Sequence, residues 1–424
     1  MPAKSWYFSL LEPLTVGRSP TRMKPPVRAD LPFSIRHLDR RAVDVVRTLQ
    51  EHGFETYLVG GCVRDSLLGL EPKDYDIATA ARPGQVRRLF RRSRIIGRRF
   101  RIVHVYAGRD VFEIATFRRE PPKNGRTADE PIQDDNAFGT AQEDALRRDF
   151  TVNGLFLDPR KREIVDYVGG MKDLERKMMI SIGDPDLRFR EDPVRILRLI
   201  KFMRRLGLGA GEAEIGAARE HAGMLAEAAQ PRLVEELFRL MQTGDMAGCF
   251  ADLVALGVVP LLAPDIAEWI ERSPDNLDRL LSMFESLDRW IRDGGEPGYG
   301  FRLACLYGPM VEDEIDPDLR TVPVRELAQI PVFLLGRLQQ RARLPRVAIS
   351  RALQILLAQE HMDPEREMLR GKKRRRRKGT QERLLASDCF PDALEFLRCR
   401  LEAAERDPAP YDEWHELGLS FLGP

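Results

Sequence analysis

The stretch TYLVGGCVRD at residues 56–65, followed by DYD at residues 74–76, decides the fold of this chain. Residues 56–59 have the composition of a short buried strand, which the glycine pair then ends. Because Gly60 and Gly61 lack side chains, backbone N–H groups there can approach a phosphate closely. A helix is expected to begin at about Val63, and a helix N-terminus favours anions. The stretch therefore predicts a strand–turn–helix unit suited to a phosphate, although a glycine pair alone often marks only a tight turn.

Asp74 and Asp76 add a second signal. In a strand, residues i and i+2 point to the same face, so the two carboxylates are expected to meet at one site. Paired carboxylate oxygens suit Mg²⁺, which proteins bind through a few carboxylates together with substrate phosphates. The alternative is an exposed strand face with two solvated aspartates. The preceding strand–glycine–helix unit favours the metal site.

The predicted secondary structure changes near residue 192, after which only helical patterns occur. The segment 38–52 has helical spacing, and mixed strand and helix patterns follow up to residue 168. Strands are predicted at 56–59, 75–79, 102–107, 111–117 and 154–157. Helices are predicted afterwards at 192–206, 231–242, 252–256, 276–292, 325–340, 347–360, 380–385 and 391–405. The pattern predicts an α+β protein with an N-terminal mixed α/β domain followed by an all-α region.

Four segments occur in order along the chain: GGCVRDSLLG at 60–69, KDYDIAT at 73–79, RRDFTVN at 147–153 and GDPDLRFREDPVRILRLIKFMRRLGL at 183–208. Together they resemble the signature of the class II tRNA nucleotidyltransferase and bacterial poly(A) polymerase family. The resemblance is dense over residues 50–240 and loose over the helical remainder. It implies a nucleotidyltransferase-type head domain followed by a helical neck, body and tail.

The expected boundaries follow from the patterns and the resemblance. Residues 1–35 are rich in proline without clear periodicity and are expected to be a loosely ordered extension. The catalytic head is expected at 36–168 and the neck with its nucleotide-selecting helix at 169–245. The helical body is expected at 246–365, and a basic segment with a C-terminal RNA-binding region at 366–424.

The resemblance also implies roles for individual residues. Asp74 and Asp76 would be catalytic ligands of Mg²⁺. Nucleotide contacts would come from Gly60, Gly61 and Arg64, from Arg148 on the triphosphate, and from Arg195 and Arg198 on the incoming nucleotide.

A third catalytic carboxylate is also expected. Asp149 in the RRDFTVN segment, which the family treats as essential, is favoured. Glu113 is the alternative, because strand alternation in VFEIATF (111–117) could aim it at the site of Asp74 and Asp76. Glu113 could equally be a plain polar strand residue.

Asp192, Arg195 and Arg198 recur every three residues in a predicted helix, so neighbouring members are expected to share a face. Asp192 could accept from an exocyclic amine while Arg195 donates to the adjacent ring nitrogen. Adenine and cytosine fit this pair, whereas guanine and uracil present the reverse pattern. The pair therefore explains why adenine or cytosine would be selected over guanine and uracil, but it does not distinguish adenine from cytosine. The alternative is a surface ion pair.

Basic residues are concentrated in two runs, although the net charge is only +2. Residues 82–101 contain nine arginines and no acidic residue, and residues 370–378 contain eight Lys or Arg. Such local runs suggest a polyanion partner. RNA-phosphate contacts are expected at Arg98, Arg99, Arg101, Lys372, Lys373, Arg374 and Arg375.

The segment IIGRRFRIVHV at 95–105 resembles the poly(A) polymerase branch of the family. The expected activity is template-independent transfer of AMP from ATP to single-stranded RNA 3′ ends, with release of pyrophosphate. A CCA-adding tRNA nucleotidyltransferase is the first alternative. A catalytically silent RNA-binding homologue is the second, but retention of Asp74, Asp76 and Arg148 argues against it.

The five cysteines are scattered without a metal or disulfide spacing, which indicates a reducing compartment. No stretch approaches 18 consecutive apolar residues, so no membrane span is expected. The apolar run near the N-terminus is cut short by Glu12 and Pro13 and has no cleavage site, so no signal peptide is expected. We expect a cytoplasmic monomer.

Overall fold

The computed structural model describes residues 25–97, 101–108, 110–119, 137–314, 344–363 and 378–422, with positions 329, 331, 332 and 335. The described residues form two compact units. The first, called the sheet unit here, takes its residues from 25–188 and 208–215. The second, called the helical unit, takes its residues from 189–207 and 216–422. Each unit is considered by itself.

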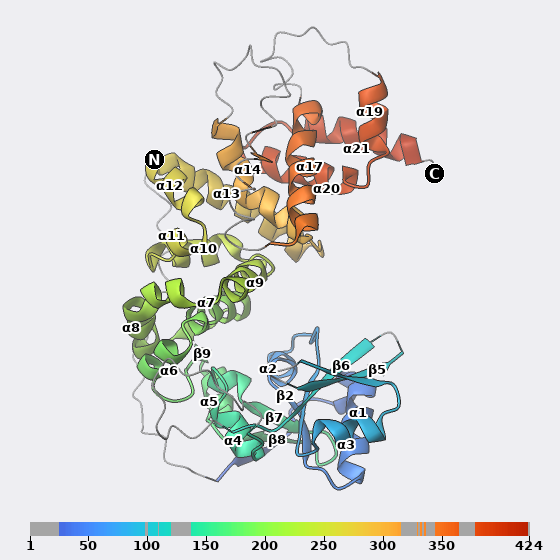
Figure 1. Cartoon of the computed structure of the whole chain (residues 1–424), viewed down its shortest axis with the longest axis vertical. Coiled ribbons are helices and arrows are strands. Elements are labelled where there is room, and N and C mark those ends of the chain that lie inside the picture. Colours follow the sequence, from blue (N-terminus) through green and yellow to red (C-terminus); the bar gives the residue numbers. More distant parts are fainter. Residues whose placement is uncertain are drawn as a thin grey trace. The chain divides into compact units, whose positions relative to one another are not determined.

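The sheet unit is built on an eight-stranded sheet in the order β1-β8-β7-β2-β3-β6-β5-β4 (Figure 1). Only β3 and β6 pair in parallel, and the other neighbours are antiparallel. The strands are β1 (Val27–Asp30), β2 (Thr56–Val59), β3 (Asp76–Thr79), β4 (Ser93–Ile96), β5 (Ile102–Ala107), β6 (Asp110–Thr116), β7 (Leu155–Asp158) and β8 (Glu163–Asp166). The short strands β9 (Met178–Met179) and β10 (Gly209–Ala210) pair separately.

Helices lie between these strands: α1 (Arg40–Glu51), α2 (Gly61–Leu67), α3 (Pro83–Leu89), α4 (Ala141–Leu146) and α5 (Gly170–Glu175). Short 3-10 turns are η2 (Ile35–His37) and η3 (Thr151–Asn153). The helix α6 (Pro185–Glu191) follows β9.

The centre of the sheet is buried on both faces. All four residues of β2 are buried, because strand alternation sends them to two covered faces. On one face, Tyr57 and Val59 pack in a cluster with Ala141 and Ala145 of α4 and with Phe156. The helix α1 packs against β2 and β3. The central strands β2, β3 and β7 are therefore a rigid base for residues at their ends.

The helical unit begins with α7 (Val194–Leu206), and α8 (Glu212–His221) leads back into it. The further elements are η4 (Ala222–Glu227), α9 (Gln230–Leu240), α10 (Met246–Ala255), α11 (Val259–Leu262), α12 (Pro264–Arg272), α13 (Pro274–Arg292), α14 (Tyr299–Glu314), α17 (Arg346–Met362), α19 (Lys378–Leu385), α20 (Phe390–Ala403) and α21 (Ala409–Leu422). The helices α13, α14, α17 and α20 pack on one another (Figure 1). The arrangement confirms the predicted fold class.

The structure corrects three expectations from the sequence. Residues 25–35 are not a loose extension, because β1 forms the edge of the sheet by pairing with β8, and the N–H of Leu31 donates to the carbonyl of Arg162 at 2.9 Å. The last predicted helix, 391–405, is followed by a further helix, α21 (Ala409–Leu422), that the sequence pattern did not predict. Asp192 precedes α7, because Pro193 disfavours helical backbone at the residue before it. The predicted helix at 325–340 lies almost wholly outside the described residues.

Among the described residues, no helix is both long enough and apolar enough to cross a membrane.

Candidate active site

The turn after β2 is shaped by Gly60. Its φ of 72° lies in the left-handed region that favours glycine. A Cβ atom at Gly60 would lie 3.1 Å from Nη1 of Arg148 and 4.0 Å from Oδ2 of Asp76. The missing side chain therefore lets a guanidinium and a carboxylate approach the same turn. The helix α2 begins at Gly61, two residues earlier than predicted.

Asp76 is the first residue of β3 and lies between two strands. It pairs with Val59 of β2 on one side and with Glu113 of β6 on the other. Although Asp76 is exposed, the surrounding protein withdraws water from its carboxylate and raises its pKa. Glu113 and Asp74 raise the pKa further, and Arg148 opposes them. The structure thus brings Asp74, Asp76, Glu113 and Arg148 together.

The segment before β3 is anchored through Tyr75. The hydroxyl of Tyr75 accepts a hydrogen bond of 3.0 Å from the N–H of Asp39, at the start of α1. Only Asp76 of the two aspartates lies within the strand, so the argument from strand alternation does not apply to Asp74. Asp74 is nevertheless close enough to act on the pKa of Asp76.

The residues present fit a divalent cation. Two further carboxylates, Glu113 and Asp74, lie close enough to Asp76 to raise its pKa, and the guanidinium of Arg148 opposes them. Hard oxygen ligands of this kind are what Mg²⁺ binds in proteins. A bound cation would relieve the repulsion that raises the pKa of Asp76.

The RRDFTVN segment forms a buried network below the turn. Oδ1 of Asp149 accepts from the backbone N–H of Phe150 at 2.8 Å and from Nδ2 of Asn153 at 3.1 Å. Oδ1 of Asn153 in turn accepts from Arg64. The Arg64 side chain, only 2% exposed, also pairs with Asp65 at 2.6 Å. The bonds from Asp149 to Asn153 and from Asn153 to Arg64 therefore link the RRDFTVN segment to α2, the helix that follows the glycine turn.

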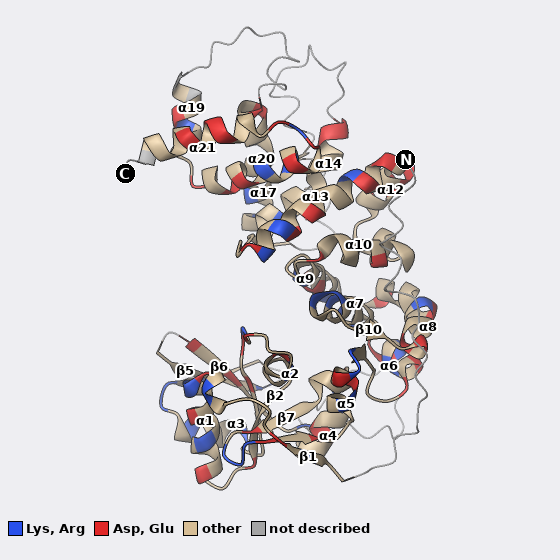
Figure 2. Ribbon diagram, turned by 180° about the vertical axis from the view of Figure 1, so that it is seen from behind, with Lys and Arg blue, Asp and Glu red and all other residues tan. Residues whose placement is uncertain are grey.

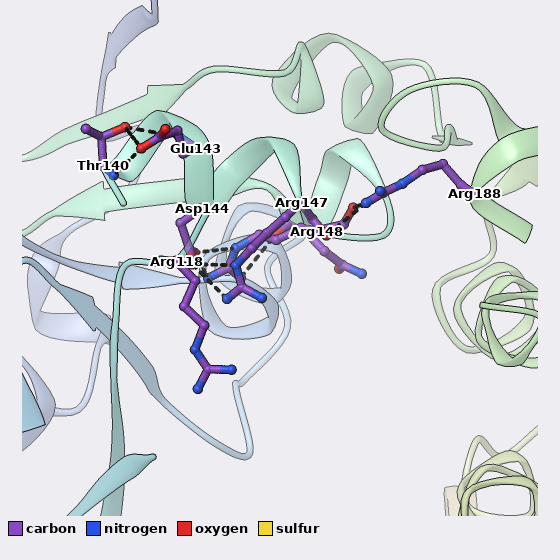
Figure 3. A network of polar contacts seen from close by, with 8 residues as sticks. Arg118, Thr140, Glu143, Asp144, Arg147, Arg148 and Arg188 are labelled. Atoms are coloured by element: carbon purple, nitrogen blue, oxygen red, sulfur yellow. Dashed lines mark hydrogen bonds and ion pairs between the residues drawn. The ribbon is translucent and has the colours of Figure 1, made fainter. Parts of the chain in front are cut away.

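Asp144 of α4 holds the two arginines that follow it (Figure 3). One carboxylate oxygen accepts from Nη2 of Arg147 at 2.7 Å and from the N–H of Arg118 at 3.1 Å. The other accepts from Nη2 of Arg148 at 3.0 Å. Burial raises the pKa of Asp144, but the two guanidinium groups outweigh it and lower the pKa below its ordinary value. Asp144 thus fixes Arg148 beside Gly60.

Arg188 of α6 supports the same segment from the other side, as Figure 3 shows. Its Nη2 donates to the carbonyl oxygens of Arg147 at 2.9 Å and of Arg148 at 3.1 Å. These carbonyls lie at the C-terminal end of α4, where a cation is electrostatically favoured. Arg188 therefore fixes the backbone that carries Arg148 and Asp149.

The predicted base-selecting residues lie in the helical unit. Asp192, Arg195 and Arg198 are half-buried, while the apolar residues between them on α7 are buried. Oδ2 of Asp192 accepts from Nη2 of Arg232 on α9 at 2.9 Å. Arg198 lies 3.6 Å from Oε1 of Glu236, whose other oxygen pairs with Lys201.

Of the predicted RNA contacts, Arg101 is described and exposed. Arg98, Arg99, Lys372, Lys373, Arg374 and Arg375 lie outside the described residues.

The sequence interpretation missed Asp144, Asn153, Arg188 and Arg232. Asp144 had a usable signal, because it lies three and four residues before Arg147 and Arg148, the spacing of helical ion pairs. Arg188 had none, because its partners are backbone carbonyls. Arg232 is 40 residues from its partner Asp192.

Two family models match the chain. One, described as the poly A polymerase head domain, matches residues 56–180. The other, described as a probable RNA and SrmB-binding site of polymerase A, matches residues 215–270.

Two relatives illustrate the similarity. Poly(A) polymerase I of Haemophilus influenzae is 36% identical over 297 residues, which cover 68% of this chain and 66% of that protein. The CCA-adding enzyme of Bacillus pumilus is 33% identical over 266 residues, which cover 62% of this chain and 63% of that protein. The matches thus span just under two thirds of these relatives' length.

The crystal structure of the Bacillus stearothermophilus CCA-adding enzyme in complex with CTP has the same fold. The TM-score is 0.62 at 24% identity, covering 90% of this chain and 82% of that chain. The motif-bearing head, the helical remainder and these similarities define a class of nucleotidyltransferases. The chain belongs to the poly(A) polymerase and tRNA nucleotidyltransferase family.

The Asp144 network generates a stability prediction. Asp144→Asn removes the charge that pairs with Arg147 and Arg148 and should destabilise the sheet unit by about 2–3 kcal/mol at neutral pH. Because the folded pKa is lowered, the contribution is complete above the ordinary value of 3.8 and is lost as pH falls through the folded pKa. Urea unfolding at a series of pH values should show the two proteins converging only below pH 3.8.

Glu143→Gln is the matched control on the same helix, since glutamine also serves a capping box. A similar loss in both variants, or a difference independent of pH, would contradict the assigned role of Asp144.

Proposed function

We propose that this chain transfers AMP from ATP to RNA 3′ ends without a template, as a poly(A) polymerase does. The observation that carries the proposal is the register of Asp76 opposite Glu113, beside a glycine turn that Arg148 also reaches. That arrangement provides carboxylates for a metal and a cation for a triphosphate within one small region. It supports nucleotidyl transfer in general, and the choice of AMP needs separate support.

Asp74 and Asp76 would hold Mg²⁺, with Glu113 as the favoured third carboxylate. When bound, the metal would lower the pKa of the RNA 3′ hydroxyl and neutralise the departing pyrophosphate. Glu113 is preferred over Asp149 because it lies opposite Asp76 in the neighbouring strand and acts on the pKa of the Asp76 carboxylate.

The protein's own groups would bind and orient the nucleotide. The amides after Gly60 and the guanidinium of Arg148 would contact the triphosphate. Asp144 and Arg188 would keep Arg148 in place, and the bonds of Arg64 to Asp65 and Asn153 support a positioning role for it.

Base selection would rest on Asp192 and Arg195, with Arg198 beside them. Asp192 would accept from the adenine N6 amine while Arg195 donates to N1, so the pair would act as a substitute template. The ion pair with Arg232 supports this role, because it orients the Asp192 carboxylate before a base arrives.

Three observations support adenylation over CCA addition. The Haemophilus influenzae relative is a poly(A) polymerase at 36% identity, against 33% for the CCA-adding relative. The match at residues 215–270 is to an RNA-binding region of polymerase A. The GRRF segment also resembles the poly(A) polymerase branch. The proposed setting is the cytoplasm, which suits five cysteines that are all unpaired.

The product of the reaction tests this proposal. Purified protein given a generic A-ended RNA should form long tails with ATP alone and incorporate CTP poorly. Asp76→Asn, which removes one metal ligand, should reduce extension by about a thousandfold or more. Products are sized on a denaturing gel. Addition limited to tRNA-like RNA and ending at CCA would refute polyadenylation, and a folded wild type with no transfer would support a silent homologue.

Base choice gives a second prediction. Asp192→Ala removes the amine acceptor, so the preference for ATP over GTP should fall by about 1–3 kcal/mol, measured as a ratio of kcat/KM values. Arg232→Ala is the control: it removes an exposed partner of the carboxylate and should cost at most about 1 kcal/mol of the preference. Unchanged selectivity in Asp192→Ala, with only a slower rate, would contradict the substitute template.

A further inference from the structure

A basic hollow of about 620 Å³ lies on the sheet unit, outside the carboxylate cluster. Its lining includes Arg82, Gln85 and Arg88 from α3 and its cap, Ile95 of β4, Arg101 before β5, and Phe138. Figure 2 shows basic residues in blue on and around α3. None of the lining residues is acidic.

Three arginines give this hollow its positive charge. Arg82, Arg88 and Arg101 are all exposed. Within the described ranges, no carboxylate forms an ion pair with any of them. They differ in this from Arg148, which Asp144 partly neutralises. Three exposed guanidinium groups around one concave surface attract a polyanion.

An aromatic ring shares the hollow with these charges. Phe138 is 38% exposed, and the guanidinium of Arg82 lies 5.5 Å from the centre of its ring. Exposed rings and guanidinium planes both stack on nucleic-acid bases. The combination of phosphate-binding charge and a stacking ring favours nucleic acid, because every nucleotide offers both a phosphate and a base.

The hollow is at the other end of the strands from the carboxylates. Asp76 begins β3, and α3 follows the end of that strand at Thr79. Glu113 lies opposite Asp76 in the neighbouring strand β6. Phe138 forms an isolated backbone pairing with Arg118, which lies beyond the end of β6. At about 3.3 Å per residue, Thr79 is already ~10 Å along the strand from Asp76. A ligand in the hollow therefore does not touch the reacting atoms.

We propose that this hollow binds the sugar–phosphate chain of single-stranded RNA, upstream of the reacting 3′ end. Arg88 and Arg101 contact phosphates, and Phe138 with Arg82 stacks on a base. The inference rests on the proposed function and gives the catalytic unit its own RNA contact. It predicts an effect on RNA affinity and not on the chemical step.

Charge reversal with a matched control tests the proposal. Arg88→Glu/Arg101→Glu changes the hollow. Arg87→Glu/Arg94→Glu makes the same change of charge at exposed residues outside its lining. Affinity is measured by fluorescence anisotropy on labelled oligoadenylate of about 15 nucleotides over a salt series. The first double variant should bind about tenfold or more weakly than the control, with a salt slope flatter by about 1.4 for two lost contacts.

Further readouts separate binding from chemistry. In Arg88→Glu/Arg101→Glu, kcat at saturating RNA should stay within about twofold, since the hollow is remote from the carboxylates. Phe138→Leu should weaken binding without changing the salt slope, because it removes stacking alone. If Arg88→Glu/Arg101→Glu has a lowered Tm, Arg88→Gln/Arg101→Gln is measured in its place. It changes the charge by about half as much and should also weaken RNA binding.

Equal weakening by both double variants would overturn the inference. It would show that RNA responds to the positive charge of the whole unit and not to the hollow. Unchanged RNA affinity would also overturn it and leave an acidic protein as the better occupant. A wild type that binds RNA through the hollow without transferring AMP would refute the proposed function alone.

Discussion

The buried carboxylate of Asp144 is the constraint on which the candidate site depends. It pairs with Arg147 and Arg148 through separate oxygens, so the second guanidinium is held beside the Gly60 turn. Arg188 fixes the carbonyls of the same two arginines, and the Asp149–Asn153–Arg64 chain fixes the segment that follows. These bonds lie in a region packed against a sheet whose central strands are buried. A triphosphate would therefore meet a cation already oriented, which lowers the entropy cost of binding.

Around Asp144 opposite charges are paired, whereas the carboxylates near Arg148 bring like charges together. Asp76 and Glu113 are in register on parallel strands, and Glu113 and Asp74 both raise the pKa of Asp76. Stability alone would not favour such a cluster, since like charges at this spacing repel. Protein sites commonly hold repelling groups where function requires them. A cation placed among them would turn the repulsion into binding energy, and the phosphates beside Arg148 would complete its ligand set.

Much of this was predictable from the sequence. The strand–glycine–helix unit and the change to an all-α region follow from local sequence patterns, and the structure confirms them. The pairing of β1 with β8 was not predictable, because a four-residue strand at a sheet edge has no period of its own. The predicted start of α7 was wrong. Asp192 fits the helical spacing of Arg195 and Arg198, but Pro193 disfavours helical backbone at the residue before it. Contacts such as Arg232 with Asp192 depend on how α9 packs on α7, which periodicity does not encode.

The cluster of Asp74, Asp76 and Glu113 has the ligand chemistry of a divalent-cation site. Whether the cluster binds such an ion is measured with Mn²⁺ by electron paramagnetic resonance, in the presence of a non-transferable ATP analogue. Wild-type protein should bind the ion saturably, and Asp76→Asn should weaken that binding about tenfold or more, since a hard cation loses one of few charged ligands. Asp110→Asn, on the same strand as Glu113 but paired with Arg41, should leave it unchanged. Equal Mn²⁺ affinity in wild type and Asp76→Asn would contradict the claim.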